Sequence, residues 1–260
     1  MKYPSILEML QSGVHFGHKD SRWHPKMKPF IFSERNRVHI INLEETEKQL
    51  KTVLPAITAM VAEGKKILFV STKPQAREIV KAAAIDCGMP YLTERWLGGM
   101  LTNFSEIKKL IRHYVEMKDK QAKGELGHYT KKEQLEISKD LEKKDGYLAG
   151  LASLTRMPDA LFIPSMQREK TAVTEANSMG IDIIGVCDTN ANPLKATYVI
   201  PANDDAVKSI QMMVGLVAEA VKEGNVEFEK RNAARIAAQP KVVAKKEGVE
   251  DRQQPQIMNV

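Results

Sequence analysis

Short apolar runs alternate with amphipathic segments in two stretches of this chain, residues 43–102 and 156–224. In the first stretch, KILFVS lies between two segments whose apolar residues recur every three or four positions, as on one face of a helix. In the second, DALFIP and IDIIGVCD enclose a helical pattern, and YVIP precedes another. Strands that alternate with helices are joined by right-handed crossovers into a mostly parallel sheet with helices on both faces. The two stretches therefore predict one α/β domain with a doubly wound parallel sheet.

Two helix boundaries are expected from residue type. Pro55 lies inside the first helical pattern and should kink or interrupt that helix, because proline lacks a backbone N–H and its ring clashes with the preceding turn. Beyond Gly224 the hydrophobic periodicity is lost, and Gln, Pro, Lys and Glu become frequent. We expect residues 225–260 to hold the end of the last helix and then a tail that is disordered from about residue 236.

Residues 103–155 interrupt the alternation, because no run in them resembles a strand. Apolar residues recur every three to four positions in two arms, which contain Phe104, Ile107, Ile111 and Tyr114, and then Ile137, Leu141, Leu148 and Leu151. The sequence AKGELGHYT between the arms is rich in turn-forming residues. We predict an inserted antiparallel helical hairpin of the coiled-coil type. Its nearly balanced charges suit a solvated helix pair or, as the alternative, an arm that docks a partner.

Residues 1–42 form a separate segment with a strong excess of positive charge. Residues 1–40 hold seven Lys or Arg and three Asp or Glu, and so contribute +4 to the formal net charge of +6. Pro25 and Pro29 make the segment too irregular for a long helix, so we expect an extended basic arm. Arginine binds phosphate oxygens in a bidentate manner, and aromatic rings stack on bases. We predict that the arm binds RNA through Arg22, Trp23, His24, Lys26, Lys28, Arg35 and Arg37.

A different interpretation of the arm is that Trp23 and Phe30 pack it against the domain while its cations are only solvated. Strand ends offer further candidates, since ligands of open α/β sheets bind beyond the carboxyl ends of the strands. Lys73 follows the first predicted strand, and Arg95 and Trp96 follow the second. We add these three residues to the expected RNA-binding set.

An enzyme would use the same edge of the sheet. The sequence, however, contains no G-x-G-x-x-G or G-x-x-x-x-G-K-[ST] loop to hold phosphates, and no G-x-S-x-G elbow to present a nucleophile. Nucleotide chemistry and acyl transfer are therefore disfavoured.

A metal site is the remaining candidate for chemistry. Asp188, Asp204 and Asp205 follow predicted strands and could converge with His18 if the N-terminal segment crosses the strand ends. Four nitrogen and oxygen ligands suit a structural zinc ion. The three carboxylates are also the basis of an alternative function, that of a metal-dependent α/β enzyme. The simpler interpretation is that the three aspartates cap a helix and end a strand, while His18 packs locally.

Cysteine usage and hydropathy indicate a cytoplasmic protein. Cys87 and Cys187 lie in apolar runs without metal-binding spacing, so we expect both to be buried and reduced. No window holds the ~20 apolar residues that a membrane span needs. The N-terminus also lacks the apolar core of a secretory signal.

Several strings, in order along the chain, carry a resemblance to a known family: GVHFGHKDSRWHPKMKPFIFSERNRVHIINLEET, ILFVSTKPQA, ERWLGGMLTNF, MPDALFI, EANSMGIDIIGVCDTNANP and YVIPANDDA. From Ile6 to Gly224, the chain resembles the bacterial small-subunit ribosomal protein family conventionally numbered two. The resemblance implies a flavodoxin-like α/β domain with a protruding helical hairpin, and a structural protein with no enzymatic activity and no required cofactor.

The resemblance also implies partners. They are the ribosomal RNA of the small subunit, near the junction of its head and body, and other small-subunit proteins. One of these is the large messenger-binding protein numbered one, which members of the family help to dock. Neither a membrane nor a small-molecule substrate is implied.

Overall fold

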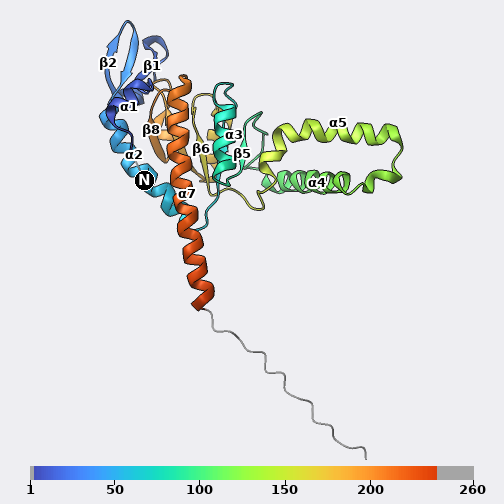
Figure 1. Cartoon of the computed structure of the whole chain (residues 1–260). Helices are drawn as coiled ribbons and strands as arrows, with labels where there is room; N and C mark the ends of the chain where they lie inside the picture. The colour runs from blue at the N-terminus through green and yellow to red at the C-terminus, as the bar shows by residue number, and fades with distance from the viewer. Residues whose placement is uncertain (1–2, 239–260) are drawn as a thin grey trace, which may run out of the picture.

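The structure is a computed structural model that describes residues 3–238 of the chain (Figure 1). Its centre is a five-stranded parallel sheet with the spatial order β5-β4-β6-β7-β8. The strands are β4 (Ile67–Val70), β5 (Tyr91–Leu92), β6 (Ala160–Ile163), β7 (Asp182–Cys187) and β8 (Tyr198–Pro201). Within this sheet the second strand along the chain lies on one side of the first and the third on the other, which is the strand order of flavodoxin. The predicted α/β fold with a parallel sheet is confirmed.

Helices cover both faces of this sheet because its strands are apolar at nearly every position. Along β4, Ile67 and Phe69 belong to one core cluster, and Leu68 and Val70 belong to a second cluster on the other face. The first cluster is completed by α2 (Leu43–Ala62), α3 (Arg77–Asp86) and α7 (Val207–Ala238). The second is completed by α6 (Lys170–Met179) and by residues of the inserted hairpin. Burial on both faces explains why the strands are continuous apolar runs in the sequence.

The inserted segment is a pair of antiparallel helices that projects from the domain (Figure 1). It consists of α4 (Phe104–Ala122), the 3-10 helix η3 (Glu125–His128), α5 (Lys131–Leu148) and the 3-10 helix η4 (Ala149–Leu151). Tyr114 on α4 donates a hydrogen bond to Asp145 on α5, and Lys118 Nζ lies 2.6 Å from the same carboxylate. These contacts join the two arms. The hairpin has the expected topology, and its coiled-coil character stays a prediction.

The N-terminal segment differs from the extended arm that its prolines suggested. It begins with α1 (Ile6–Gln11) and continues as β1 (Phe16–Lys19), the 3-10 helices η1 (Asp20–Arg22) and η2 (Pro25–Phe30), β2 (Ile31–Arg35) and β3 (Val38–Ile41). The three strands form an antiparallel sheet in the order β1-β3-β2. Asn36 and Arg37 form the β2–β3 turn with φ angles of 52° and 60°, as a two-residue hairpin requires. We call residues 16–41 the basic sheet.

Two helices bear on the expectations from residue type. α2 continues through Pro55 without interruption. α7 continues past Gly224 to Ala238. The disordered tail expected from about residue 236 lies, from residue 239 onward, outside the described residues. Glycine at position 224 allows α7 to pack closely against α2. A Cβ there would lie 2.7 Å from Val61 Cβ and 2.8 Å from the Thr58 carbonyl oxygen. None of the helices in residues 3–238 combines the length and hydrophobicity needed to span a bilayer.

The packing of α7 against α2 gives a matched pair of substitutions. Gly224→Ala should lower the free energy of unfolding by about 1–3 kcal/mol, because the added methyl group overpacks the contact with α2. Gly215 lies in the same helix, and a Cβ added there would meet no atom within 4 Å outside the local helix backbone. Gly215→Ala should therefore raise the free energy of unfolding by up to about 1 kcal/mol, because alanine favours the helix over glycine. Urea denaturation measures both, and equal effects of the two substitutions would contradict the close approach.

Candidate nucleic-acid interface

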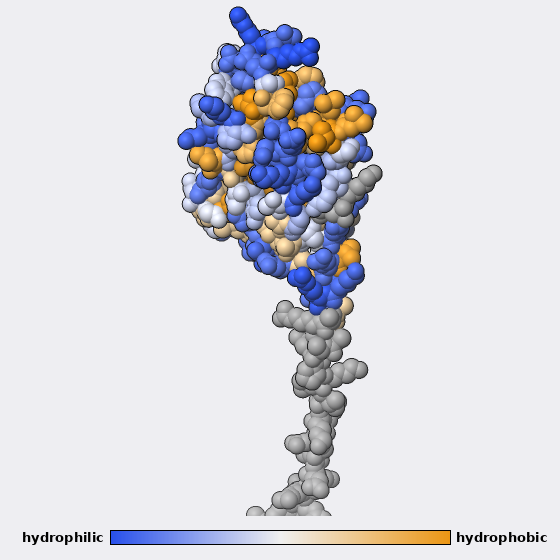
Figure 2. Space-filling model, turned by 90° about the vertical axis from the view of Figure 1, so that its left-hand side faces the viewer, coloured by the Kyte–Doolittle hydropathy of each residue, from blue (hydrophilic) through white to orange (hydrophobic). Residues whose placement is uncertain are grey.

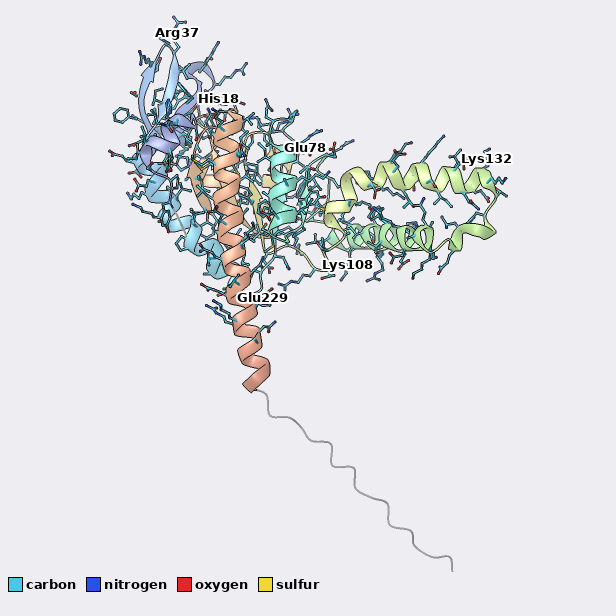
Figure 3. The ribbon with its side chains drawn as sticks, viewed as in Figure 1. His18, Arg37, Glu78, Lys108, Lys132 and Glu229 are labelled. Atoms are coloured by element: carbon cyan, nitrogen blue, oxygen red, sulfur yellow. The ribbon has the colours of Figure 1, made fainter. Side chains whose placement is uncertain are left out.

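The cations of the basic sheet lie on its surface. Arg22, Lys26, Lys28, Arg35 and Arg37 are all exposed. Across residues 3–238, no carboxylate lies within ion-pair distance of any of these five side chains. Figure 3 shows Arg37 at the far tip of the β2–β3 hairpin, pointing away from the domain. The basic sheet therefore offers five uncompensated positive charges to an anionic partner.

Trp23 and His24 lie closer to the domain than the cations. Both side chains are half-buried, and the Trp23 ring centroid lies 5.3 Å from that of His39. His24 Nδ1 accepts a hydrogen bond of 3.2 Å from the Lys26 amide, and the His24 amide donates one of 2.7 Å to the Thr189 carbonyl oxygen. These contacts fix the segment that leads into η2 and tie it to the α/β domain. Base stacking by either ring stays a prediction.

Thr189, two residues beyond the end of β7, is the residue on which the basic sheet docks. Its hydroxyl oxygen accepts a hydrogen bond of 2.8 Å from the His18 amide. Its own amide donates to Asp188 Oδ1 at 2.5 Å. A Cβ at Gly17 would lie 2.6 Å from Thr189 Cγ2, so glycine is needed for β1 to approach this closely. Asn203 adds a further link, since its amide donates to the Val14 carbonyl oxygen at 3.1 Å.

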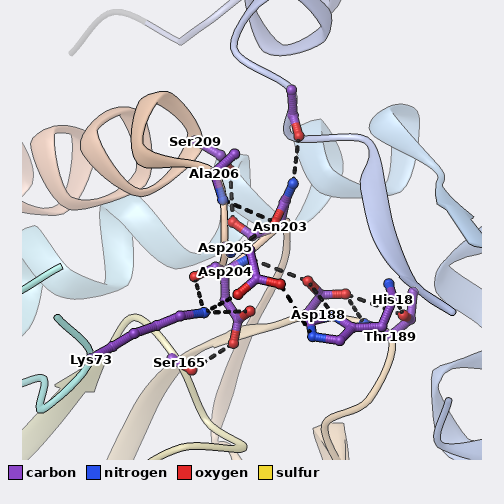
Figure 4. Close-up of polar contacts among 11 residues, drawn as sticks. His18, Lys73, Ser165, Asp188, Thr189, Asn203, Asp204, Asp205, Ala206 and Ser209 are labelled. Carbon is purple, nitrogen blue, oxygen red and sulfur yellow. Dashed lines mark hydrogen bonds and ion pairs between the residues drawn. The ribbon is translucent and has the colours of Figure 1, made fainter. Parts of the chain in front are cut away.

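A network of charged side chains lies beneath the basic sheet, at the carboxyl ends of β4, β6, β7 and β8 (Figure 4). Asp188 and Asp204 are almost completely buried. His18 Nδ1 lies 3.0 Å from Asp188 Oδ2, and His18 Nε2 lies 3.3 Å from Asp205 Oδ2. Lys73 Nζ lies 2.9 Å from Asp204 Oδ1 and 2.7 Å from Asp205 Oδ1. The Ser165 hydroxyl donates to Asp204 Oδ2 at 2.5 Å.

These contacts shift the acid–base properties of the network. The hydrogen bond to Asp188 raises the pKa of His18 above 6.5, although burial acts in the opposite direction. Burial raises the pKa of Asp204, and the Asp188 charge adds to this effect, while Lys73 and Ser165 oppose it. Burial also opposes the charge on Asp205, but its contacts with Lys73 outweigh this and lower its pKa. Positive charge on His18 and Lys73 thus stabilises three neighbouring carboxylates.

The geometry reduces the predicted set of four metal ligands to three. Ligand atoms of His18, Asp188 and Asp204 all lie within 4.8 Å of one another. Asp205 faces the other imidazole nitrogen of His18, so it cannot share an ion bound at Nδ1. An ion in this cluster would also meet the ammonium group of Lys73, which already binds Asp204. The donors suit zinc, and the existing ion pairs compete with it.

Two of the three residues added from the strand ends are turned inward. The Lys73 side chain is only 11% exposed and its charge is paired, so it does not belong to the exposed basic surface. Trp96 is 8% exposed, and its Nε1 donates to Glu175 at 3.0 Å. The amides of Gly99 and Leu101 donate to the same carboxylate, which explains the structural role of the ERWLGG segment. Arg95 alone is exposed.

Sequence reasoning missed several participants. Lys19 lines a hollow of about 320 Å³ together with His18 and Arg22. Its exposed position beside Arg22 extends the basic surface. Thr189 and Ser165 are not among the predicted site residues, because a hydroxyl group carries no sequence signal of the partner that it binds across the fold.

Comparisons with known proteins agree with one another. The sequence model of the family described as Ribosomal protein S2 matches residues 9–224. The Small ribosomal subunit protein uS2 of Chlorobium luteolum is 48% identical over 221 residues, which cover 85% of this chain and 87% of that protein. The protein of the same name from Chlorobium phaeovibrioides is also 48% identical over 221 residues, covering 85% of this chain and 86% of the relative.

The raised pKa of His18 predicts a pH-dependent contribution to stability. Because its pKa in the folded state lies above 6.5, this contribution is fully present below that pH and is lost as the pH rises through the folded-state pKa. With a chelator present, the stability difference between the unaltered chain and His18→Asn should therefore be larger at about pH 6 than at about pH 9. Urea denaturation at both pH values measures it. A bound zinc ion would reverse the order, since metal and protons compete for the imidazole.

Proposed function

The chain belongs to the ribosomal protein S2 family, whose members are structural proteins and not enzymes, and we propose that it binds the ribosomal RNA of the small subunit through the basic sheet. Family membership supports a structural role in the small ribosomal subunit and rules out the alternative of a metal-dependent enzyme. We place the RNA contact near the junction of head and body, as the resemblance implies, and the protein in the cytoplasm.

One observation carries the RNA-binding proposal: five cations share the small basic sheet, and all are exposed without a paired carboxylate among the described residues. Lys73, in contrast, is largely buried and paired with Asp204. Exposed Arg and Lys side chains that gather on one small element can bind several phosphates together and release the counterions condensed on the RNA. Arg22 ends η1, and Lys26 and Lys28 lie in η2, which directly follows the His24 amide bonded to Thr189.

Apolar side chains on the same end of the molecule support a protein partner as well. Phe32 on β2 is 74% exposed and Phe16 on β1 is 50% exposed. Ile6, Leu7 and Leu10 of α1 are exposed too. Figure 2 shows hydrophobic side chains gathered near the top of the face that carries the N-terminal elements. Exposed apolar surface of this kind favours a protein contact over an RNA contact. We propose that it helps to dock the messenger-binding protein numbered one.

The proposed function requires no cofactor. A structural zinc ion held by His18, Asp188 and Asp204 would fasten the basic sheet to the strand ends, and the compact donor cluster supports this possibility. The Lys73 ion pairs argue for a network that is already compensated. Repeating the His18→Asn comparison with zinc in place of the chelator decides between the two.

Removing charge from the basic sheet should weaken RNA binding. Replacing Arg22, Lys26 and Lys28 with alanine should leave the fold intact, because all three side chains are exposed. The dependence of log affinity on log salt concentration should become shallower by roughly 2–3, at 0.7–0.9 for each lost phosphate contact. Filter binding of small-subunit RNA over a salt series measures this slope.

A matched control removes the same charge from other faces. Lys81 on α3 and Lys208 and Lys230 on α7 are exposed and lie outside the basic sheet. Their combined replacement with alanine should change the slope little. If both triple variants lower the slope equally, the basic sheet is not the interface.

The apolar contact has a separate test. Phe32→Ser should leave stability within about 0.5 kcal/mol, because the ring is largely exposed. Small subunits reconstituted with this variant should retain less of the messenger-binding protein, as measured by gel densitometry. Ile85→Ser, an equally polar substitution of a 60% exposed side chain on α3, serves as the control. Unchanged retention with Phe32→Ser would refute the docking surface.

A further inference from the structure

A second positively charged hollow lies on the α/β domain, apart from the basic sheet. It has a volume of about 340 Å³ and is lined by residues that follow three neighbouring strands: Thr72 after β4, Glu94 and Arg95 after β5, and Arg168 after β6. Here the strand order reverses, since β5 lies on one side of β4 and β6 on the other. A crevice at the carboxyl ends of strands, where the order reverses, is the usual ligand site of doubly wound sheets.

The charges around this hollow do not cancel. Arg77 Nη1 lies 3.1 Å from Glu94 Oε2, which forms one compensated pair. The second carboxylate, that of Glu169, accepts hydrogen bonds from the Thr72 amide at 2.6 Å and from the Thr72 hydroxyl at 2.8 Å. Both carboxylates are thus bonded within the protein. With three arginines and two glutamates, the lining keeps a formal charge of +1.

Two arginines remain without a carboxylate. Arg95 and Arg168 are exposed, and no ion pair joins either one to a carboxylate within the described part of the chain. They extend from different strand ends toward one opening. Two guanidinium groups on one cavity match the oxygens of a single phosphate, which accepts paired hydrogen bonds from such groups.

The N-terminus of α6 adds to the positive potential of the hollow. Glu169 occupies the N-cap position, but its side chain binds Thr72 and does not cap the helix. The first-turn amides of a helix lack acceptors within the helix, and its dipole favours a nearby anion. Thr171, in this first turn, lines the hollow. The helix therefore reinforces the preference for an anion that the two arginines already establish.

We propose that this hollow binds one backbone phosphate of the small-subunit RNA, between Arg95 and Arg168, as a second contact in addition to the basic sheet. The inference rests on the proposed RNA-binding function. The lining favours a polymer over a free metabolite, because small-molecule sites enclose their ligand in largely apolar walls. Here the lining groups other than Trp96 are charged or hydroxyl-bearing.

The test uses the full-length chain with both arginines replaced by alanine. The salt dependence of affinity for small-subunit RNA should become shallower by roughly 0.7–0.9, since one phosphate contact is lost. Ethylation interference should show that modification of one particular phosphate no longer weakens binding. That phosphate should differ from the ones lost with the Arg22, Lys26 and Lys28 variant. Replacement of both arginines with lysine should restore the slope but not the full affinity, because lysine keeps the charge and loses the bidentate geometry.

The outcomes separate this inference from the proposed function. If the basic-sheet variant weakens RNA binding while the Arg95 and Arg168 variant changes neither slope nor interference, only the second contact is wrong. If neither variant affects RNA binding, the proposed function itself fails. Titration of the protein with inorganic phosphate adds a further arm. Phosphate binding that depends on the two arginines, together with an unchanged RNA interference pattern, would assign the hollow to a free phosphate and overturn the RNA contact.

Discussion

Two buried carboxylates, Asp188 and Asp204, set the arrangement of the functional end of the molecule. A buried ion left without a partner costs several kcal/mol, so each needs a compensating group nearby. His18 and Lys73 supply the positive charge from segments remote in sequence. His18 can do so only if β1 crosses the ends of the central strands, and Thr189 and Gly17 shape that crossing. The position of the basic sheet is therefore a consequence of charge burial in the α/β domain.

The molecule separates two kinds of positive charge. His18 and Lys73 face inward and are used to hold the protein together. The cations on the outer surface of the basic sheet, and Arg95 and Arg168 on the domain, have no such internal use. Since pairing within the protein would reduce attraction for phosphates, the division leaves the proposed RNA binding to exposed groups that take no part in the buried network. This arrangement lets one segment be both a structural support and an interface.

Periodicity in the sequence was sufficient for the α/β domain, because strands buried on both faces and helices with one apolar face leave strong patterns. It failed for the basic sheet, where two prolines hid three short strands and the turn at Asn36 and Arg37 lacks the usual glycine. It gave no sign of the packing at Gly224, where the absence of a side chain lets α7 lie close to α2. For the site, residue type revealed charge but not orientation. Lys73 and Trp96 were placed with the surface residues, although tertiary contacts turn both inward.

The link between β1 and Thr189 also has a consequence in time. His18 and Thr189 are 171 residues apart in the sequence. During synthesis at roughly 5–20 residues per second, the basic segment leaves the ribosome on the order of 10–30 s before the residue that anchors it. The basic segment is thus synthesised early but gains its anchor on the α/β domain only late in synthesis. Throughout that interval its cations belong to a chain without its anchor, next to the ribosomal RNA of the particle that is making it.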